Sequence, residues 1–508
     1  MNNHTAAADT DLPRFLGVLQ SDKYLVIPQN ILGSGLHKNY LLLLWRPFNF
    51  QKPSFQLQNL GFSAFIFFLH PQLFAKISLA GGHTMKTANQ LTFTTYETSL
   101  KLKPNDPIKI IFDSINWSFI HPLTNDKYSA LPQGAEGYDP ISLFKAQLLI
   151  YLDEVSSDRK LAEALRYNGR LCLLCGFNFL KTPSNGTFTN FRDRLGADTF
   201  YDILHNLIAQ SIVMKIIKGG DTAIDSTHVW AYASKFGYKT CSCKGKCDCP
   251  KSYSDTDAQW GAKSKDYLFF GYKVHLIVDA KSQLPLEVIV TPGNAADSPQ
   301  AKPLLNGAQK KHPEVKIDTS AMDSAYDSHE NYRFAIEEAK VAPIIALNPR
   351  GGADAISEGS LFLSQNGSYT CIAGFKVVYW GKEEKRGRLK FRCPAVLGKC
   401  QCLFRSTCSK SKYGRTFYLH PKRNYRLVGT IPRGTYLWQE KYDGRTSVER
   451  AYSEEKGSHK LADPRVRGLA KIKIHVYLAL CAQIIKRIGT ATMEKLIRPE
   501  PMLYPLRA

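Results

Sequence analysis

The chain has 508 residues, enough for several domains that each bury a core. Its composition, 44% hydrophobic and 22% charged, is typical of a folded globular protein and argues against a disordered or fibrous one. The 67 lysines and arginines exceed the 44 aspartates and glutamates by a formal charge of +23, which favours a polyanionic partner, nucleic acid before an anionic membrane.

No run of residues reaches the roughly 18 apolar residues of a membrane span. The N-terminus also lacks the charged start and apolar core of a signal peptide. We therefore expect a cytoplasmic protein with no membrane partner, whose 12 cysteines are thiols or metal ligands in a reducing compartment.

Residues 1–84 differ from the rest of the chain in their aromatic clusters, such as LLLLWRPFNF, and in their few charges. The segment from Met85 onwards reads as an ordinary N-terminus, and Gly81-Gly82 can be encoded by a ribosome-binding sequence. We expect that the native protein starts at Met85 and that residues 1–84 are translated upstream sequence.

Residues 85–219 are predicted to form a helical N-terminal domain. In PISLFKAQLLIYLDEV the apolar side chains recur at helical spacing, and Ser156-Ser157 offers the cap of a second helix. Basic side chains on short helices favour a DNA-binding module of the helix-turn-helix kind, and a plain helical bundle is the alternative.

Residues 220–354 alternate strand-like and helical runs, which predicts the first part of an α/β core with some parallel pairing. Short alternating runs predict a β-rich insertion at 355–435. Helices resume near Gly444, so 436–495 is expected to complete the core, followed by a tail at 496–508.

Two acids follow strand-like runs in the α/β core. Asp225 follows Thr222-Ala223-Ile224, and Asp323 follows Ala321-Met322. A carboxylate at the end of a strand is held on rigid backbone at the sheet edge, where metal sites are built. The alternative is that both acids cap turns.

Glu449 provides a third acid. From Tyr442, the residues Arg445, Glu449 and Lys456 lie at offsets 3, 7 and 14, within a sector of roughly 60° of one helix face. If the helix begins near Gly444, Tyr442 lies just before it and points the same way. A carboxylate beside a phenol and two cations suits a metal-bound phosphodiester. The alternative is a solvated face with Arg445–Glu449 pairing.

These residues resemble the DDE transposases of bacterial insertion sequences, and within them the group that carries a Tyr-x2-Arg-x3-Glu-x6-Lys signature. Further segments match in order, namely DSTHVWAYASKFG, FFGYKVHLIVDA, TPGNAADSPQ and MDSAYDSHENY. The helical segment from Gly137 onwards is similar to the N-terminal domain of the same group. The resemblance covers roughly residues 110–490.

The resemblance implies a multidomain protein with a ribonuclease-H-like core that the β-rich insertion interrupts. Asp225, Asp323 and Glu449 would be the catalytic ligands of two Mg²⁺ (or Mn²⁺) ions, while Tyr442, Arg445 and Lys456 would grip DNA phosphates. The resemblance also implies cleavage and strand transfer on double-stranded DNA, which includes the terminal inverted repeats and the target DNA. It implies a homodimer on DNA, located at the nucleoid. The alternatives are a ribonuclease-H-like repair nuclease and a zinc-stabilised, non-catalytic DNA-binding protein.

Two cysteine sets are candidate zinc ligands. Cys241, Cys243, Cys247 and Cys249 lie within nine residues, close enough to enclose one Zn²⁺, although unliganded thiols in a loop are the alternative. The second set, in the insertion, has the pattern C-x6-C-x-C-x5-C and consists of Cys393, Cys400, Cys402 and Cys408. Cys371 reads as structural.

Near the acids, Asp297 reads as a turn cap or a support for the metal ligands.

Overall fold

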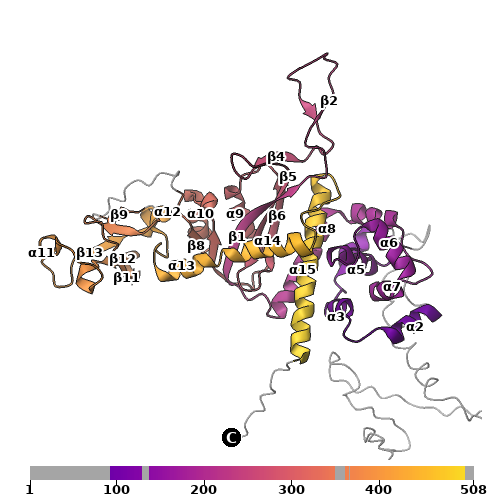
Figure 1. Cartoon of the computed structure of the whole chain (residues 1–508). Coiled ribbons are helices and arrows are strands. Elements are labelled where there is room, and N and C mark those ends of the chain that lie inside the picture. The colour runs from indigo at the N-terminus through magenta and orange to yellow at the C-terminus, as the bar shows by residue number, and fades with distance from the viewer. Residues whose placement is uncertain (1–91, 129–136, 349–360, 365, 498–508) are drawn as a thin grey trace, which may run out of the picture. The chain divides into compact units, whose positions relative to one another are not determined.

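The computed structural model describes residues 92–128, 137–348, 361–364 and 366–497 (Figure 1). The expected start at Met85, the segment 1–84 and all but the first two residues of the 496–508 tail lie outside these ranges. Among the described residues, no helix combines the length and apolar character that crossing a lipid bilayer requires.

The N-terminal part is helical, as predicted. Its caps are local: Asp106, Asp139, Ser157 and Asn168 each accept a backbone N–H of the helix that follows. The helices are α2 (Phe93–Lys101), α3 (Pro107–Asp113), α4 (Ile120–Thr124), α5 (Pro140–Tyr151), α6 (Asp158–Tyr167), α7 (Gly169–Cys175) and α8 (Asn185–Val213). Buried aromatic and aliphatic side chains such as Phe144 and Phe200 join them into one core.

The middle of the chain forms a mixed sheet of six strands. They are β1 (Gly220–Trp230), β4 (Gln259–Ala262), β5 (Leu268–Asp279), β6 (Pro285–Pro292), β7 (Ile317–Met322) and β8 (Ala342–Ile345). β5 pairs antiparallel with β1, β4 and β6, whereas β1, β7 and β8 are parallel. Helix α9 (Ala301–Lys311) connects β6 to β7, and α10 (His329–Arg333) precedes β8.

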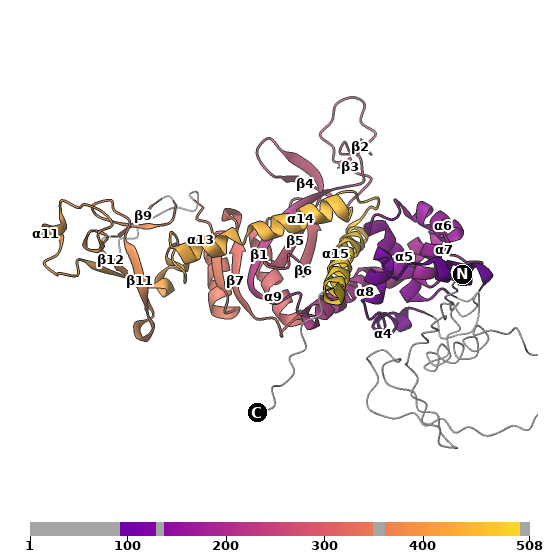
Figure 2. The ribbon, with the colours of Figure 1, turned by 60° about the horizontal axis from the view of Figure 1, so that its bottom comes forward.

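Three helices follow the insertion: α13 (Tyr436–Asp443), α14 (Thr446–Ser458) and α15 (Leu469–Ile497). α14 packs on β1 and β5 through Val448, Ala451 and Tyr452, and α15 packs against α8, α5 and β6 (Figure 2). The expected helix start near Gly444 is close to the start of α14 at Thr446, but a separate helix, α13, precedes it from Tyr436 and ends before Gly444-Arg445.

Between β8 and α13 the described chain is rich in short strands: β9 (Leu361–Leu363), β10 (Tyr369–Cys371), β11 (Val378–Glu383), β12 (Arg388–Arg392) and β13 (Thr416–Leu419). The short helices α11 (Arg405–Cys408) and α12 (Tyr425–Val428) lie in the same stretch. Leu389, Phe391 and Phe417 belong to a small hydrophobic cluster of its own. The domain boundaries at 354/355 and 435/436 stay predictions.

A buried ion pair fastens this β-rich part to the sheet. The Asp327 side chain is fully buried and accepts from Arg426 at 2.9 Å and from the backbone N–H of Asn348 at 2.8 Å. Arg433 lies 3.8 Å from the same carboxylate and donates to the carbonyl oxygens of Arg426 and Ile345. Removing the charge of Asp327 would leave two buried guanidinium groups without a counter-charge.

We therefore expect Asp327→Asn to lower the free energy of unfolding by about 3 kcal/mol. Asp318→Asn is the matched control, because the Asp318 side chain is half exposed and pairs with the exposed Lys316; it should change stability by less than about 0.5 kcal/mol. Urea unfolding followed by circular dichroism measures both. Equal effects of the two substitutions would contradict the fastening role of Asp327.

Candidate active site

The pairing of β1 with β7 brings two of the three predicted acids together. Thr222 faces Ser320 and Ala223 faces Ala321, so partners differ by 98 in residue number. Asp225 and Asp323 also differ by 98, and the same register places them on neighbouring chain segments whose backbones are roughly 5 Å apart. Asp225 nevertheless lies in the middle of β1 and not at its end as expected, since β1 continues to Trp230 against β5.

Glu449 approaches from α14. The Tyr452 hydroxyl lies 2.8 Å from the carbonyl oxygen of Asp225 and 2.9 Å from that of Val274, which fixes α14 over β1 and β5. Glu449 precedes Tyr452 by three residues and lies on the same face of α14, near enough to Asp225 for its charge to contribute to the raised pKa of that acid. The Glu449 side chain is 49% exposed.

Arg445 lies between the acids. Its guanidinium donates to the Glu449 carboxylate at 2.6 Å and lies 4.0 Å from the Asp225 carboxylate. The i,i+4 pairing of Arg445 with Glu449, first considered as an alternative to a functional role, is thus present. It coexists with a position beside Asp225, so the two interpretations are compatible.

The electrostatics of this cluster are unfavourable to the ionised acids. Burial, with the negative charges of Asp323 and Glu449, raises the pKa of Asp225 to about 6, although the Ser226 N–H and Arg445 oppose the shift. Burial also raises the pKa of Asp323. Three carboxylates facing one guanidinium leave an excess of negative charge, and their all-oxygen donor set fits a hard divalent cation such as Mg²⁺ or Mn²⁺.

The three carboxylates do not form a closed ligand set. Asp323 accepts the backbone N–H of Ala325 at 2.8 Å, and Glu449 turns toward Arg445. Among the described residues, the four sulfur atoms of Cys241, Cys243, Cys247 and Cys249 are the single group of three or more metal-ligand atoms within 4.8 Å of one another. Rotation of Glu449 away from Arg445 would be needed for all three acids to share a metal.

Tyr442 and Lys456 are placed differently from the prediction of a single helix face. Tyr442 belongs to α13, where its ring stacks on Trp438 at 4.8 Å and packs beside Ala321. Lys456 lies on α14, seven residues and roughly 10 Å beyond Glu449. Burial and the nearby Lys263 lower the pKa of Lys456. Glu449 and Lys456 share α14, and Arg445 is the residue that caps its N-terminus.

A second set of charged groups, which sequence reasoning did not assemble, supports the site. Asp297 does not cap the turn that follows it. Instead its carboxylate accepts Lys273 Nζ at 3.0 Å and lies 3.7 Å from the buried His275 ring. Lys273 is the one charged residue in the run FFGYKVHLIV, and that isolation was the signal available in the sequence.

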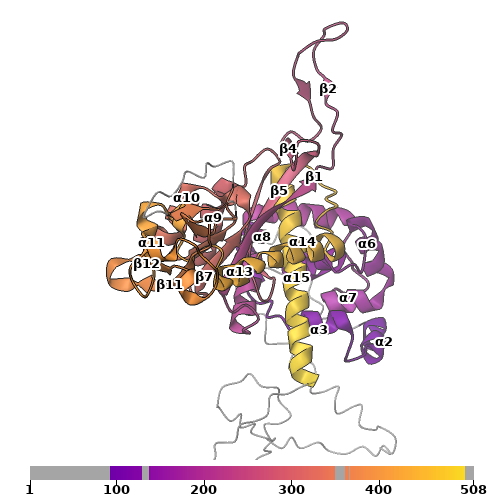
Figure 3. The ribbon, with the colours of Figure 1, turned by 60° about the vertical axis from the view of Figure 1, so that its left-hand side comes forward.

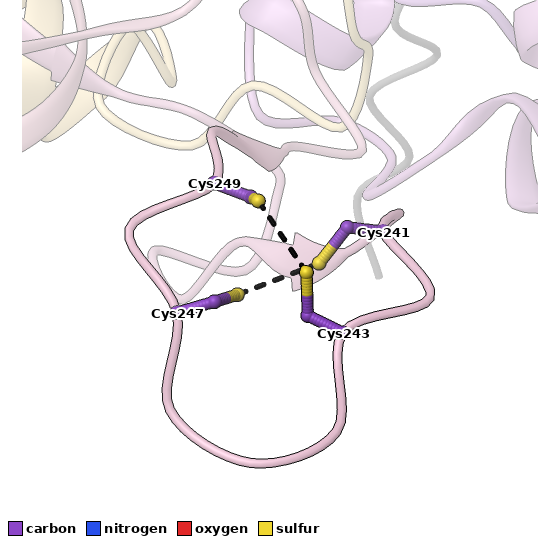
Figure 4. Close-up of side chains that lie close together, drawn as sticks. All are labelled: Cys241, Cys243, Cys247 and Cys249. Atoms are coloured by element: carbon purple, nitrogen blue, oxygen red, sulfur yellow. Dashed lines mark hydrogen bonds between the residues drawn. The ribbon is translucent and has the colours of Figure 1, made fainter.

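The first cysteine set is assembled in the structure (Figure 4). Cys241 Sγ lies 3.4 Å from Cys247 Sγ, and Cys243 Sγ lies 3.8 Å from Cys249 Sγ. A tetrahedral Zn²⁺ with four thiolates places sulfurs about 3.8 Å apart, so these residues fit zinc. Hydrogen bonds from the Cys243 backbone and the Cys247 side chain lower the pKa of Cys241 to about 7, which favours the thiolate that binds metal.

The second cysteine set is less compact. Cys393, Cys402 and Cys408 line a pocket of about 280 Å³ together with Cys371, which sequence reasoning treated as structural. Cys400 does not line that pocket. These residues come from β10, α11 and the loops after β12, and their sulfurs do not reach the mutual distances of the first set. A zinc site here stays a prediction.

Comparison with known proteins supplies the family. Residues 218–485 match the family described as Transposase DDE domain, and residues 97–194 match the family described as Transposase domain (DUF772). No curated protein matches the chain. A solved structure of piggyBac transposase in a synaptic complex with hairpin DNA aligns over 76% of this chain and 75% of that chain, at 11% identity and a TM-score of 0.32. No conclusion rests on a likeness of that size.

The raised pKa of Asp225 gives a pH-dependent prediction. An acid with a folded pKa of about 6 stabilises the fold at low pH and loses that contribution as pH rises through 6. The side chain of Asp225→Asn does not titrate. Without divalent metal, the free energy of unfolding of this variant should therefore exceed that of the wild type by about 2–3 kcal/mol at pH 8 and by roughly half that amount at pH 5.

Asp221→Asn on the same strand is the matched control. Although burial opposes it, hydrogen bonds from Lys441 and Thr319 lower the pKa of Asp221, so this substitution should destabilise the protein at pH 8. Denaturant titrations at the two pH values measure both effects. A gain at Asp225 that is absent or independent of pH would contradict the electrostatic description of the site.

Proposed function

The chain belongs to the DDE transposases, because the family match at 218–485 covers more than half of it, and from this premise we propose that Asp225, Asp323 and Glu449 are its catalytic triad. Transposases of this family cut DNA and transfer the cut strands, and they use divalent metal ions. The single observation that carries the assignment is the gathering of the three acids around Arg445, with Asp225 in β1 and Asp323 directly after the neighbouring strand β7.

Each acid contributes a carboxylate from a different element. Asp225 and Asp323 are held by the sheet, whereas Glu449 reaches the same place from α14 after leaving Arg445. Two Mg²⁺ or Mn²⁺ ions bound there would supply activation of the attacking hydroxyl and stabilisation of the leaving oxygen. The rigid pair fixes the geometry of the site, and the exposed third acid completes it.

The basic residues around the triad would hold DNA. Arg445, released from Glu449, presents a planar guanidinium to a phosphate beside the triad. Lys456 extends the contact along α14, and Tyr442 supports Arg445, whose guanidinium lies 5.9 Å from the Tyr442 ring centroid. In this arrangement, both metal binding by Glu449 and phosphate binding by Arg445 require the Arg445–Glu449 ion pair to open.

The wider features are proposals of the same kind. The strand succession β6-β5-β1-β7-β8, antiparallel and then parallel, supports a ribonuclease-H-like core. Terminal inverted repeats and target DNA as substrates, a homodimer that joins two ends, and residence at the bacterial nucleoid follow from the family. A repair nuclease or a non-catalytic zinc protein is disfavoured by the family match.

The triad makes a direct prediction. Asp225→Ala and Glu449→Ala should each lower Mg²⁺-dependent cleavage and strand transfer at the inverted repeats by roughly a thousandfold or more, because a metal ligand is lost. Both variants should still bind the same DNA. Gel analysis of labelled ends, beside a mobility-shift assay, measures the two properties.

Asp318→Ala is the matched control, since Asp318 lies five residues before Asp323 and its carboxylate is exposed at the sheet edge. It should cleave and transfer strands as the wild type does. Wild-type cleavage in the Asp225→Ala protein, or equal loss in the Asp318→Ala protein, would refute the triad. Cleavage without strand transfer in the wild type would favour the repair nuclease.

We propose also that Cys241, Cys243, Cys247 and Cys249 hold one structural Zn²⁺. Elemental analysis of the purified protein should find zinc, and Cys243→Ser with Cys249→Ser should lower it by one equivalent per chain. Cys393→Ser with Cys402→Ser reports separately on the second set. An unchanged zinc content after the first double substitution would exclude this site.

A further inference from the structure

An arm leaves the sheet between β1 and β4. It spans residues 231–258, and its one element of regular structure is the two-residue pairing of β2 (Tyr238–Lys239) with β3 (Lys251–Ser252). Figures 1 and 3 show β2 standing away from the strands that carry the arm. So short a ribbon cannot be stable in water by pairing alone. The four cysteines at its tip have their sulfur atoms within 4.8 Å of one another, so a bound metal ion would join its two sides.

The base of the arm is firmly anchored to the core. Tyr253 stacks on Phe270 at 4.8 Å between ring centroids. The buried Asp255 carboxylate accepts the Tyr272 hydroxyl at 2.8 Å and the Gly468 N–H at 3.2 Å. Arg467 donates to the carbonyl oxygen of Tyr232 at 2.7 Å. The arm therefore leaves the sheet with its base fixed to β5 and to the start of α15.

The tip, in contrast, is exposed and basic. Phe236 and Tyr238 are 74% and 57% exposed, so the arm buries little of its own aromatic surface. Residues 234–252 contain five lysines and one aspartate, a formal charge of +4. A Zn²⁺ with four thiolates carries −2 and leaves the arm at +2. A positive and poorly buried surface is suited to the phosphate backbone of a nucleic acid.

The arm also has a defined reach from the catalytic site. β1 runs from Asp225 to Trp230, where the arm begins, and five residues of strand span roughly 17 Å. That distance corresponds to about five base pairs of a DNA duplex, at roughly 3.4 Å per pair. A duplex with a phosphate at Asp225 and lying along β1 would thus pass the base of the arm.

We propose that residues 234–252 form a zinc-clipped DNA clamp that contacts the phosphate backbone and whose base lies about half a helical turn from the cleaved bond. The partner is double-stranded DNA, contacted without base readout by the lysines of the tip. The zinc site holds the tip in shape, and the anchored base fixes its direction relative to Asp225. This inference rests on the proposed function, because it takes the triad as the site of cleavage.

The test is a salt titration of DNA binding with charge-reversed lysines. The protein is the full chain carrying Asp225→Ala, without Mg²⁺, so that no cleavage interferes. Lys244→Glu with Lys246→Glu, at the exposed tip, should weaken binding of a 40-base-pair end duplex roughly tenfold. It should also reduce the slope of log K against log salt by about 2, because two phosphate contacts are lost.

Lys218→Glu with Lys310→Glu is the control pair of equal charge, both exposed outside the arm. It should leave the slope within about 0.5 of the parent protein. Cys243→Ser with Cys249→Ser should reproduce the loss of affinity without changing the melting temperature of the core. Equal effects of the two lysine pairs, or no effect of the tip pair, would overturn the clamp.

The outcome is separable from that of the proposed function. If the triad assignment is wrong, Mg²⁺-dependent cleavage is either absent from the wild type or unchanged by Asp225→Ala. The comparison of DNA binding by the lysine variants still reports on the arm. If only the clamp is wrong, cleavage by the wild type remains and the tip pair binds DNA as the parent does.

Discussion

The parallel register of β1 and β7 is the constraint on which the site depends. Once Thr222 pairs with Ser320, an offset of 98 residues is imposed on everything that follows, and Asp225 comes to lie beside Asp323. Burial removes water from the Asp225 carboxylate, and the negative charge of the neighbouring Asp323 adds to this effect, so the pKa of Asp225 is raised. The hydrophobic core and the sheet hydrogen bonds must outweigh that cost, as is common at functional sites.

The remaining parts of the site respond to this pair of acids. The Tyr452 hydroxyl donates to the carbonyl oxygen of Asp225 and so fixes α14 on β1. Glu449 in α14 and Arg445 at its N-terminus are thereby placed beside the two aspartates. Arg445 offsets part of the negative charge in the structure described here. On the proposed function, a metal ion would compete with Arg445 for Glu449 and a DNA phosphate would compete with Glu449 for Arg445, so the two ligands would be coupled through one guanidinium. The buried Asp327–Arg426 pair holds the β-rich part of the chain against the sheet that carries Asp323.

Local patterns in the sequence were sufficient for the helical N-terminal part and for the mixed core, while the roles of the three acids stay a prediction. They were insufficient wherever a residue is placed by a distant contact. The spacing of Tyr442 and Glu449 fits one continuous helix, yet stacking on Trp438 and packing on Ala321 place Tyr442 in a separate helix. Likewise, β1 continues beyond Asp225 because β5 pairs with it as far as Trp230. The Lys273–Asp297 ion pair joins residues that are 24 apart in sequence. Cys371 reaches the pocket of the second cysteine set from another strand.

The central claim is that Asp225, Asp323 and Glu449 together hold catalytic metal. Anomalous diffraction from crystals of the protein with a cleaved DNA end and Mn²⁺ tests it most directly. We expect anomalous density bounded by the three carboxylates, with Glu449 turned away from Arg445 and Arg445 on a DNA phosphate. Manganese density elsewhere, or density at Asp225 and Asp323 with Glu449 still bound to Arg445, would contradict the account.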